Sequence, residues 1–246
     1  MDALWTADLW IAVGQIIMID ILLGGDNAVV IALACRQLAP AQRTRGIVWG
    51  TVGAIALRVV LIFFALTLLA IPFLKLVGAA LLVWIGVKLL VPEEEGHGDV
   101  QASDKLWAAV KTVIVADLVM SVDNVIAIAG AAESAGGEHK MGLVVFGLLV
   151  SVPIIVWGSQ LVIKLMDRFP AIIVVGGMLL GWIAGTMSVT DPAVMGYMPL
   201  QAAAVAGGAA EVADAARYAA GVAGAVLVWL TAWGLKRTRA AQDTHA

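Results

Sequence analysis

Two segments of the chain place acidic and amide side chains inside long apolar runs. The first reads DILLGGDN at positions 20–27, and the second reads DLVMSVDN at positions 117–124. The side chains that recur at matching positions are Asp20, Asp26, Asn27, Asp117, Asp123 and Asn124. A carboxylate at the centre of a bilayer costs roughly 2.5–3.5 kcal/mol to insert, and nothing about folding an apolar helix requires four of them. The pattern therefore predicts a site that binds cations within the membrane.

The chemistry of these side chains indicates which cations such a site would take. Carboxylate and amide oxygens suit Mn²⁺, Mg²⁺ and Ca²⁺, whereas Zn²⁺ and Cu⁺ sites use imidazole and thiolate ligands. The three histidines, His97, His139 and His245, all fall in polar segments. We expect the metal to be a transported ion, with Mn²⁺ favoured, and we expect no prosthetic group.

Three further side chains are accessory candidates. Met120 lies three residues from both Asp117 and Asp123, where its thioether would favour Mn²⁺ over Ca²⁺, although ordinary packing is the alternative. Ser121 shares a helical face with Asp117. Arg58 lies near the middle of an apolar run, and it is either a counter-ion of the site or a structural partner of one aspartate.

A glycine pair, Gly24 and Gly25, lies between the first two aspartates. On an ideal helix Asp26 would point about 240° away from Asp20. Glycine pairs are places where helices kink or unwind, and an interruption here would let the two carboxylates converge and release backbone carbonyls. We therefore predict a helix break at this pair. The second segment has no such pair.

The composition excludes a soluble domain. Of 246 residues, 62% are hydrophobic and 13% are charged, with a mean hydropathy of +0.98. The single cysteine, Cys35, excludes an intramolecular disulfide and a cysteine-based metal cluster. Residues 1–8 show no positive region or cleavage site, so we expect no cleaved signal peptide. We expect no nucleic-acid binding and no enzymatic activity, with one enzymatic alternative considered below.

Apolar runs of about 20 residues, the length needed to cross a bilayer, predict an all-α membrane protein with seven transmembrane helices. The predicted spans lie near residues 9–34, 46–70, 73–91, 107–132, 141–165, 170–189 and 218–236.

The distribution of Lys and Arg over the loops predicts the orientation. One side receives eleven cations: Arg36, Arg43, Arg45, Lys88, Lys105, Lys111, Lys164, Arg168, Lys236, Arg237 and Arg239. The other side receives three: Lys75, Lys140 and Arg217. The N-terminus is therefore predicted outside and the C-terminus in the cytoplasm.

The chain contains an internal repeat. The aspartate segments align at an offset of 97, and VGAALLVWIG at 77–86 aligns with VGGMLLGWIA at 175–184 at an offset of 98. Each copy holds three spans, an odd number, so the second copy must be inverted. The predicted organisation is repeat 1 at 9–91, a cytoplasmic linker at 92–106, repeat 2 at 107–190, an external loop at 191–217, a seventh transmembrane helix at 218–236 and a cytoplasmic tail at 237–246. The segment 192–217 could instead contain a partial re-entrant helix.

Inverted repeats with an ion site near the midplane are typical of secondary transporters. Carboxylates this close together repel when all are ionised, so we expect metal and protons to compete for the site, as in an antiporter. The expected partners are a divalent metal ion, protons and the lipid bilayer, and the sequence leaves a homodimer open.

Two other functions remain as alternatives. An intramembrane aspartyl protease also uses two aspartates on two helices, but Leu23 replaces the first glycine of its Gly-x-Gly-Asp pattern. A membrane protein that binds metal and delivers it to secreted partners would carry the same site as a transporter.

The segments GGDNAVVIA at 24–32 and SVDNVIAIA at 121–129, with the Trp-Ile segments around Trp84 and Trp182, resemble the TerC family of integral membrane proteins and its YjbE-like branch. The resemblance covers residues from about 10 to 190. It implies a manganese exporter of the bacterial inner membrane, related to LysE-like carriers, and an association with tellurium resistance. It also implies that the six paired acidic and amide residues form the ion site.

Overall fold

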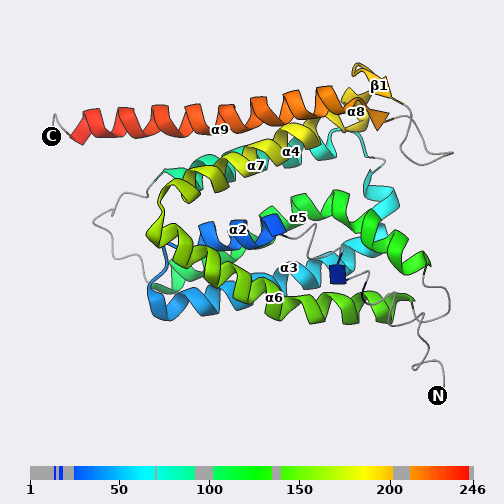
Figure 1. Ribbon diagram of the computed structural model, residues 1–246, viewed down its shortest axis with the longest axis horizontal. Helices are drawn as coiled ribbons and strands as arrows, with labels where there is room; N and C mark the ends of the chain where they lie inside the picture. The colour runs from blue at the N-terminus through cyan, green and yellow to red at the C-terminus, as the bar shows by residue number, and fades with distance from the viewer. Residues whose placement is uncertain are drawn as a thin grey trace. The chain divides into compact units, whose positions relative to one another are not determined.

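The computed structural model describes residues 14, 17–18, 25–69, 71–91, 102–134, 140–201 and 211–243, which are almost entirely helical (Figure 1). The helices are α2 (Gly25–Cys35), α3 (Pro40–Leu69), α4 (Leu74–Leu90), α5 (Ala102–Ser134), α6 (Lys140–Arg168), α7 (Ala171–Val189), α8 (Pro192–Met195) and α9 (Asp214–Asp243). Two short antiparallel strands, β1 (Leu200–Gln201) and β2 (Glu211–Val212), precede α9.

The predicted fold class, an all-α membrane protein, is confirmed. Four helices of the described chain contain a stretch long and apolar enough to cross a bilayer: Pro40–Phe64, Val145–Arg168, Ala171–Val189 and Asp214–Arg239. Each of the seven predicted ranges is helical wherever it is described, except at the end residues Phe73, Val91 and Pro170. The count of seven spans and the inverted repeat stay predictions.

Several helices extend beyond the predicted spans. Helix α5 begins at Ala102, inside the predicted linker 92–106, and α9 begins at Asp214, inside the predicted loop 191–217. The physical reason is that apolar runs mark the hydrocarbon thickness, whereas a helix continues through polar residues into the aqueous layer. The described part of the loop forms α8 and the β1–β2 pair, which the sequence did not predict.

The chain divides into two compact units. Unit 1 comprises residues 1–68 and 100–168, with α2, α3, α5 and α6, and unit 2 comprises residues 69–99 and 169–246, with α4, α7, α8, α9 and the two strands. The units cut across the predicted repeats: unit 1 takes the first two spans of each copy, and unit 2 takes the third span of each copy and the seventh.

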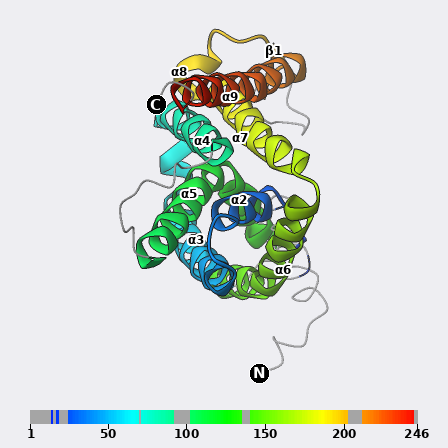
Figure 2. The same ribbon diagram turned by 90° about the vertical axis from the view of Figure 1, so that its left-hand side faces the viewer.

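In unit 1, glycines allow α3 and α5 to pack closely and in parallel. A Cβ added at Gly53 would lie 2.6 Å from the Cδ1 of Ile114, and one at Gly50 would lie 3.0 Å from a methyl group of Val113. Figure 2 shows α3, α5 and α6 arranged around α2. Helix α2 packs against both α5 and α6, and its apolar residues from Val30 to Cys35 are buried.

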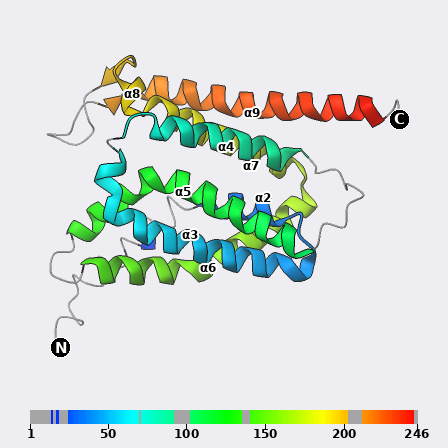
Figure 3. The ribbon, with the colours of Figure 1, turned by 180° about the vertical axis from the view of Figure 1, so that it is seen from behind.

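In unit 2, α7 and α9 are antiparallel and pack backbone against backbone. A Cβ at Gly224 would overlap the carbonyl oxygen of Gly181, and one at Gly185 would overlap that of Ala220. Small residues permit such close contact between membrane helices, where lipid supplies no hydrophobic driving force. Helix α4 lies beside α9 (Figure 3), with Leu90 in a buried cluster around Val228.

Helices α4 and α7, the third spans of the two predicted copies, run antiparallel within unit 2. The start of α4 meets the end of α7, where the Lys75 ammonium donates to the Thr190 hydroxyl at 3.4 Å. The end of α4 meets the start of α7, where Leu90 packs against Gly177. An inverted repeat would give this pairing.

A buried carboxylate joins the ends of these helices. Asp191 accepts hydrogen bonds from the backbone N–H groups of Ala193 at 2.8 Å, Phe73 at 2.9 Å, Lys75 at 3.0 Å and Leu76 at 3.2 Å. It thereby caps α8 and the first turn of α4 together. Phe73 has a φ of 67°, a left-handed conformation that these bonds help to hold.

Replacing Gly224 by alanine should lower the stability of unit 2. The added methyl group must displace the backbone of α7, and overpacking of this kind costs about 1–3 kcal/mol. The matched control is Gly234→Ala on the same helix, where a Cβ meets nothing within 4 Å. Thermal unfolding of both variants in one detergent tests this prediction, and equal unfolding temperatures would contradict it.

The Asp191 carboxylate should make stability depend on pH. Burial alone would raise the pKa of Asp191, but its four backbone N–H donors outweigh this and hold the pKa below its usual range. Its contribution is therefore complete above the unfolded-state pKa of about 3.9 and is lost as the pH falls further. Compared with the wild type, Asp191→Asn should unfold at a lower temperature at pH 7, with the difference shrinking in acid. A difference that stays constant with pH would argue against this role.

Candidate functional site

An ion pair is buried among the apolar helices of unit 1. The Nη2 of Arg58, on α3, lies 2.5 Å from the Oδ1 of Asp117, on α5. The Arg58 Nε donates to the Ser121 Oγ at 3.0 Å, and that hydroxyl donates to the Asp117 Oδ2 at 3.0 Å. Arg58 is 2% exposed and Asp117 is 6% exposed. The three side chains form a closed ring of charge-assisted hydrogen bonds.

The local fold explains why this ring forms. Asp117 and Ser121 are four residues apart on α5, so their side chains share a face. The close glycine packing of α3 on α5 brings Arg58 within reach of that face. Removing one partner of a buried ion pair costs about 3–5 kcal/mol, because the other charge is left uncompensated. The sequence left two roles open for Arg58, and the structure pairs it with one aspartate, Asp117.

Helix α2 contributes an amide with no partner. The Asn27 side chain is 4% exposed, and within the described part of the chain neither its Nδ2 nor its Oδ1 has a hydrogen-bond partner. Asp26 precedes it, and its carboxylate accepts the Asn27 backbone N–H at 2.8 Å. Asp26 also lies within electrostatic range of Asp117 and Arg58. Side chains from both predicted copies therefore face a common region of unit 1.

The structure describes only some of the predicted site residues. Asp20 and Gly24 lie outside the described residues, as does the side chain of Asp123. The Asn27 N–H bonds to a side chain, which fits a helix that starts at Gly25. The predicted helix break at Gly24 and Gly25 stays a prediction, because the residues immediately before Gly25 are not described.

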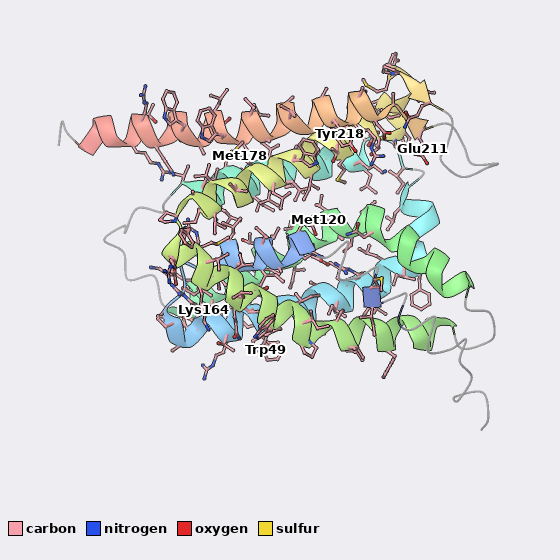
Figure 4. All side chains as sticks on the ribbon, in the orientation of Figure 1. Trp49, Met120, Lys164, Met178, Glu211 and Tyr218 are labelled. Atoms are coloured by element: carbon pink, nitrogen blue, oxygen red, sulfur yellow. The ribbon has the colours of Figure 1, made fainter. Side chains whose placement is uncertain are left out.

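Two predicted site residues lie on α5 close to the ion pair. Met120 is buried on this helix, between Val119 and Ser121 in the chain (Figure 4). Asn124 is half-buried one turn further on. The position of Met120 suits either of the roles that the sequence left open for it, ion ligand or packing, and the assignment of Asn124 to the ion site stays a prediction.

Among the side chains that the structure describes, no three His, Cys, Asp or Glu gather closely enough to hold a metal ion. The predicted site needs Asp20 and the Asp123 side chain, which are outside that set. The chemistry of the described donors fits a hard divalent ion, because Asp26, Asn27 and Asp117 offer only oxygen ligands. The four-aspartate site stays a prediction.

Sequence reasoning missed two polar residues. Thr51 on α3 is 1% exposed, and its Oγ1 has no hydrogen-bond partner in the described structure. Nothing in the sequence distinguishes it from an ordinary helix-packing threonine. The sequence places Asp191 only at the start of the predicted loop 191–217, although an aspartate before proline is a signal for a helix N-cap.

Comparisons with known proteins agree with the membrane architecture. The sequence model of the integral membrane protein TerC family matches residues 5–240. The chain is 44% identical over 191 residues to "Uncharacterized membrane protein YjbE" of Bacillus subtilis, covering 78% of this chain and 85% of that protein. It is 26% identical over 188 residues to "Uncharacterized membrane protein YceF" of the same organism, covering 73% and 71%. No solved structure matches the chain.

Replacing Asn27 by leucine should stabilise the metal-free protein. An unsatisfied buried polar group costs about 1–3 kcal/mol, and leucine fills a similar volume without any polar atom. Thermal unfolding in a metal chelator, with the exposed Thr44→Leu as the control for added apolar surface, measures the effect. A lower unfolding temperature for Asn27→Leu would show that the amide is satisfied by residues outside the described set.

Proposed function

The chain belongs to the TerC family of integral membrane proteins, as its paired motifs predicted, and on this premise we propose that it is a secondary transporter that exports Mn²⁺ from the cytoplasm. The ion would bind to carboxylate and amide oxygens within the membrane: Asp20, Asp26, Asn27, Asp117, Asp123 and Asn124. We propose no enzymatic activity and no resident cofactor.

The unpartnered amide of Asn27 is the observation that carries this proposal. A buried amide that bonds to nothing in the described part of the chain reduces the stability of the fold unless something else satisfies it, and a bound ion would be such a partner. Asp26, next to it, supplies negative charge. An amide oxygen beside a carboxylate is a ligand set that hard divalent cations prefer.

The buried charges on α3 and α5 support transport rather than static binding. Ionisable groups inside apolar helices are expensive, and they mark ion pathways in membrane proteins. Asp117 is compensated by Arg58, so an ion that reaches this carboxylate enters a region already balanced in charge. A site that can be balanced without metal can also release it.

The choice of metal rests on the ligand chemistry. Oxygen ligands admit Mn²⁺, Mg²⁺ and Ca²⁺, and a thioether ligand from Met120 would favour Mn²⁺ because it is the softest of the three. We propose exchange for protons, because repelling carboxylates bind protons when metal leaves. We propose a bacterial inner membrane location, as the family resemblance implies. The excess of Lys and Arg on one side favours an N-terminus outside and a C-terminus in the cytoplasm.

Asp26→Asn and Asp123→Asn should each strongly reduce export. Each change removes one charged ligand and should reduce the transport rate by about tenfold or more. The host cells lack their own manganese exporters. Those that express either variant should accumulate Mn²⁺ and become sensitive to it, whereas those that express the wild-type protein should stay resistant. The measurements are cellular manganese content and growth in added Mn²⁺.

The matched control is Asp104→Asn, which makes the same chemical change at an exposed position in the first turn of α5. It should protect cells as well as the wild type. Full protection by both Asp26→Asn and Asp123→Asn, at equal protein levels in the membrane, would refute the assignment of the site.

A further inference from the structure

The guanidinium of Arg58 is bound to the carboxylate of Asp117, which the proposed function assigns to the metal as a ligand. It contacts the Asp117 Oδ1 at 2.5 Å, and the Ser121 hydroxyl links the Arg58 Nε to the other Asp117 oxygen. Both Asp117 oxygens are therefore engaged in the described structure. A metal ion cannot use this carboxylate fully while Arg58 stays in place.

The arginine has no counterpart in the second copy. The offset of 97 that aligns the aspartate segments places Gly147 opposite Gly50, and it places Ile155 opposite Arg58. Ile155 is buried on α6, which packs against α2 in unit 1. A spanning helix at this place in the repeat can therefore be built with an apolar residue, so the fold of the repeat does not itself require a cation.

We propose that Arg58 is a tethered counter-ion that competes with the divalent metal for Asp117. In the metal-free state the guanidinium neutralises this carboxylate, and when the metal binds it moves off Asp117. Its return helps to release the ion. This inference rests on the proposed function and adds to it a mechanism for releasing the bound metal ion.

Charge and geometry both suit Arg58 to this role. Arginine stays protonated at every physiological pH, so it compensates Asp117 without needing a proton from either side of the membrane. A divalent ion carries twice its charge and can displace it, whereas a monovalent ion gains no such advantage over a preformed, desolvated ion pair. The same competition would therefore exclude K⁺ and Na⁺ from the site.

The test measures Mn²⁺ affinity and transport separately, using full-length purified protein. Isothermal titration with Mn²⁺ in lipid nanodiscs gives the affinity, and Mn²⁺ flux in liposomes gives the rate. Arg58→Gln removes the competing charge, so it should bind Mn²⁺ about tenfold tighter or more and transport it more slowly. If Arg58 served only to hold α3 and α5 together, its removal would destabilise the protein without the combination of tighter Mn²⁺ binding and slower transport.

Three further variants sharpen the result. Ser121→Ala loosens the hold on Arg58 without changing any charge, so it should tighten Mn²⁺ binding by less than Arg58→Gln does. Arg58→Lys keeps the charge and should stay close to the wild type in rate. Arg45→Gln makes the same chemical change at an exposed position of α3 and should alter neither quantity.

Unchanged or weaker Mn²⁺ binding by folded Arg58→Gln would overturn the inference. If that variant does not fold, Ser121→Ala decides, because unchanged affinity in it would overturn the inference equally. The proposed function fails in a different way: the wild type would then neither bind nor transport Mn²⁺. If the wild type transports Mn²⁺ but Arg58→Gln binds it no more tightly than the wild type does, the proposed function holds and the counter-ion role of Arg58 is wrong.

Discussion

A buried charge among apolar helices must be compensated. In unit 1 this requirement constrains how closely, and in which register, α3 packs against α5. Asp117 needs a cation within hydrogen-bond distance, and Arg58 provides one only if α3 and α5 approach closely in a defined register. Glycines such as Gly50 and Gly53 allow that approach, because a Cβ at either position would press against a side chain of α5, Val113 or Ile114. The small residues of α3 are thus a condition for the polar centre.

The two units differ in whether particular buried polar groups have hydrogen-bond partners. In unit 2 the buried carboxylate of Asp191 accepts four backbone hydrogen bonds and serves to join helix ends. In unit 1 the buried Asn27 amide and Thr51 hydroxyl have no partner in the described structure. A satisfied group contributes stability, whereas an unsatisfied one reduces it and suggests that a ligand completes its bonding. This contrast supports our proposal that the ion site lies in unit 1.

Much of this could be predicted from the sequence, because the strongest constraints were local. Apolar runs predicted the helices, and the four-residue spacing of Asp117 and Ser121 predicted their shared face. The partner of Arg58 could not be predicted, since it depends on the register between α3 and α5, which side-chain packing decides. The hydrogen bonds of Asp191 to the start of α4 depend likewise on residues more than a hundred positions away. The convergence of all four aspartates stays a prediction.

Transport by the purified protein tests the central claim most directly. The protein would be reconstituted in liposomes, and uptake of Mn²⁺, Ca²⁺, Mg²⁺ and Zn²⁺ would be compared with and without an imposed pH gradient. The account predicts saturable Mn²⁺ uptake that exceeds uptake of the other ions and increases when protons can move in the opposite direction. No Mn²⁺ uptake above that of protein-free liposomes, under either condition, would contradict it.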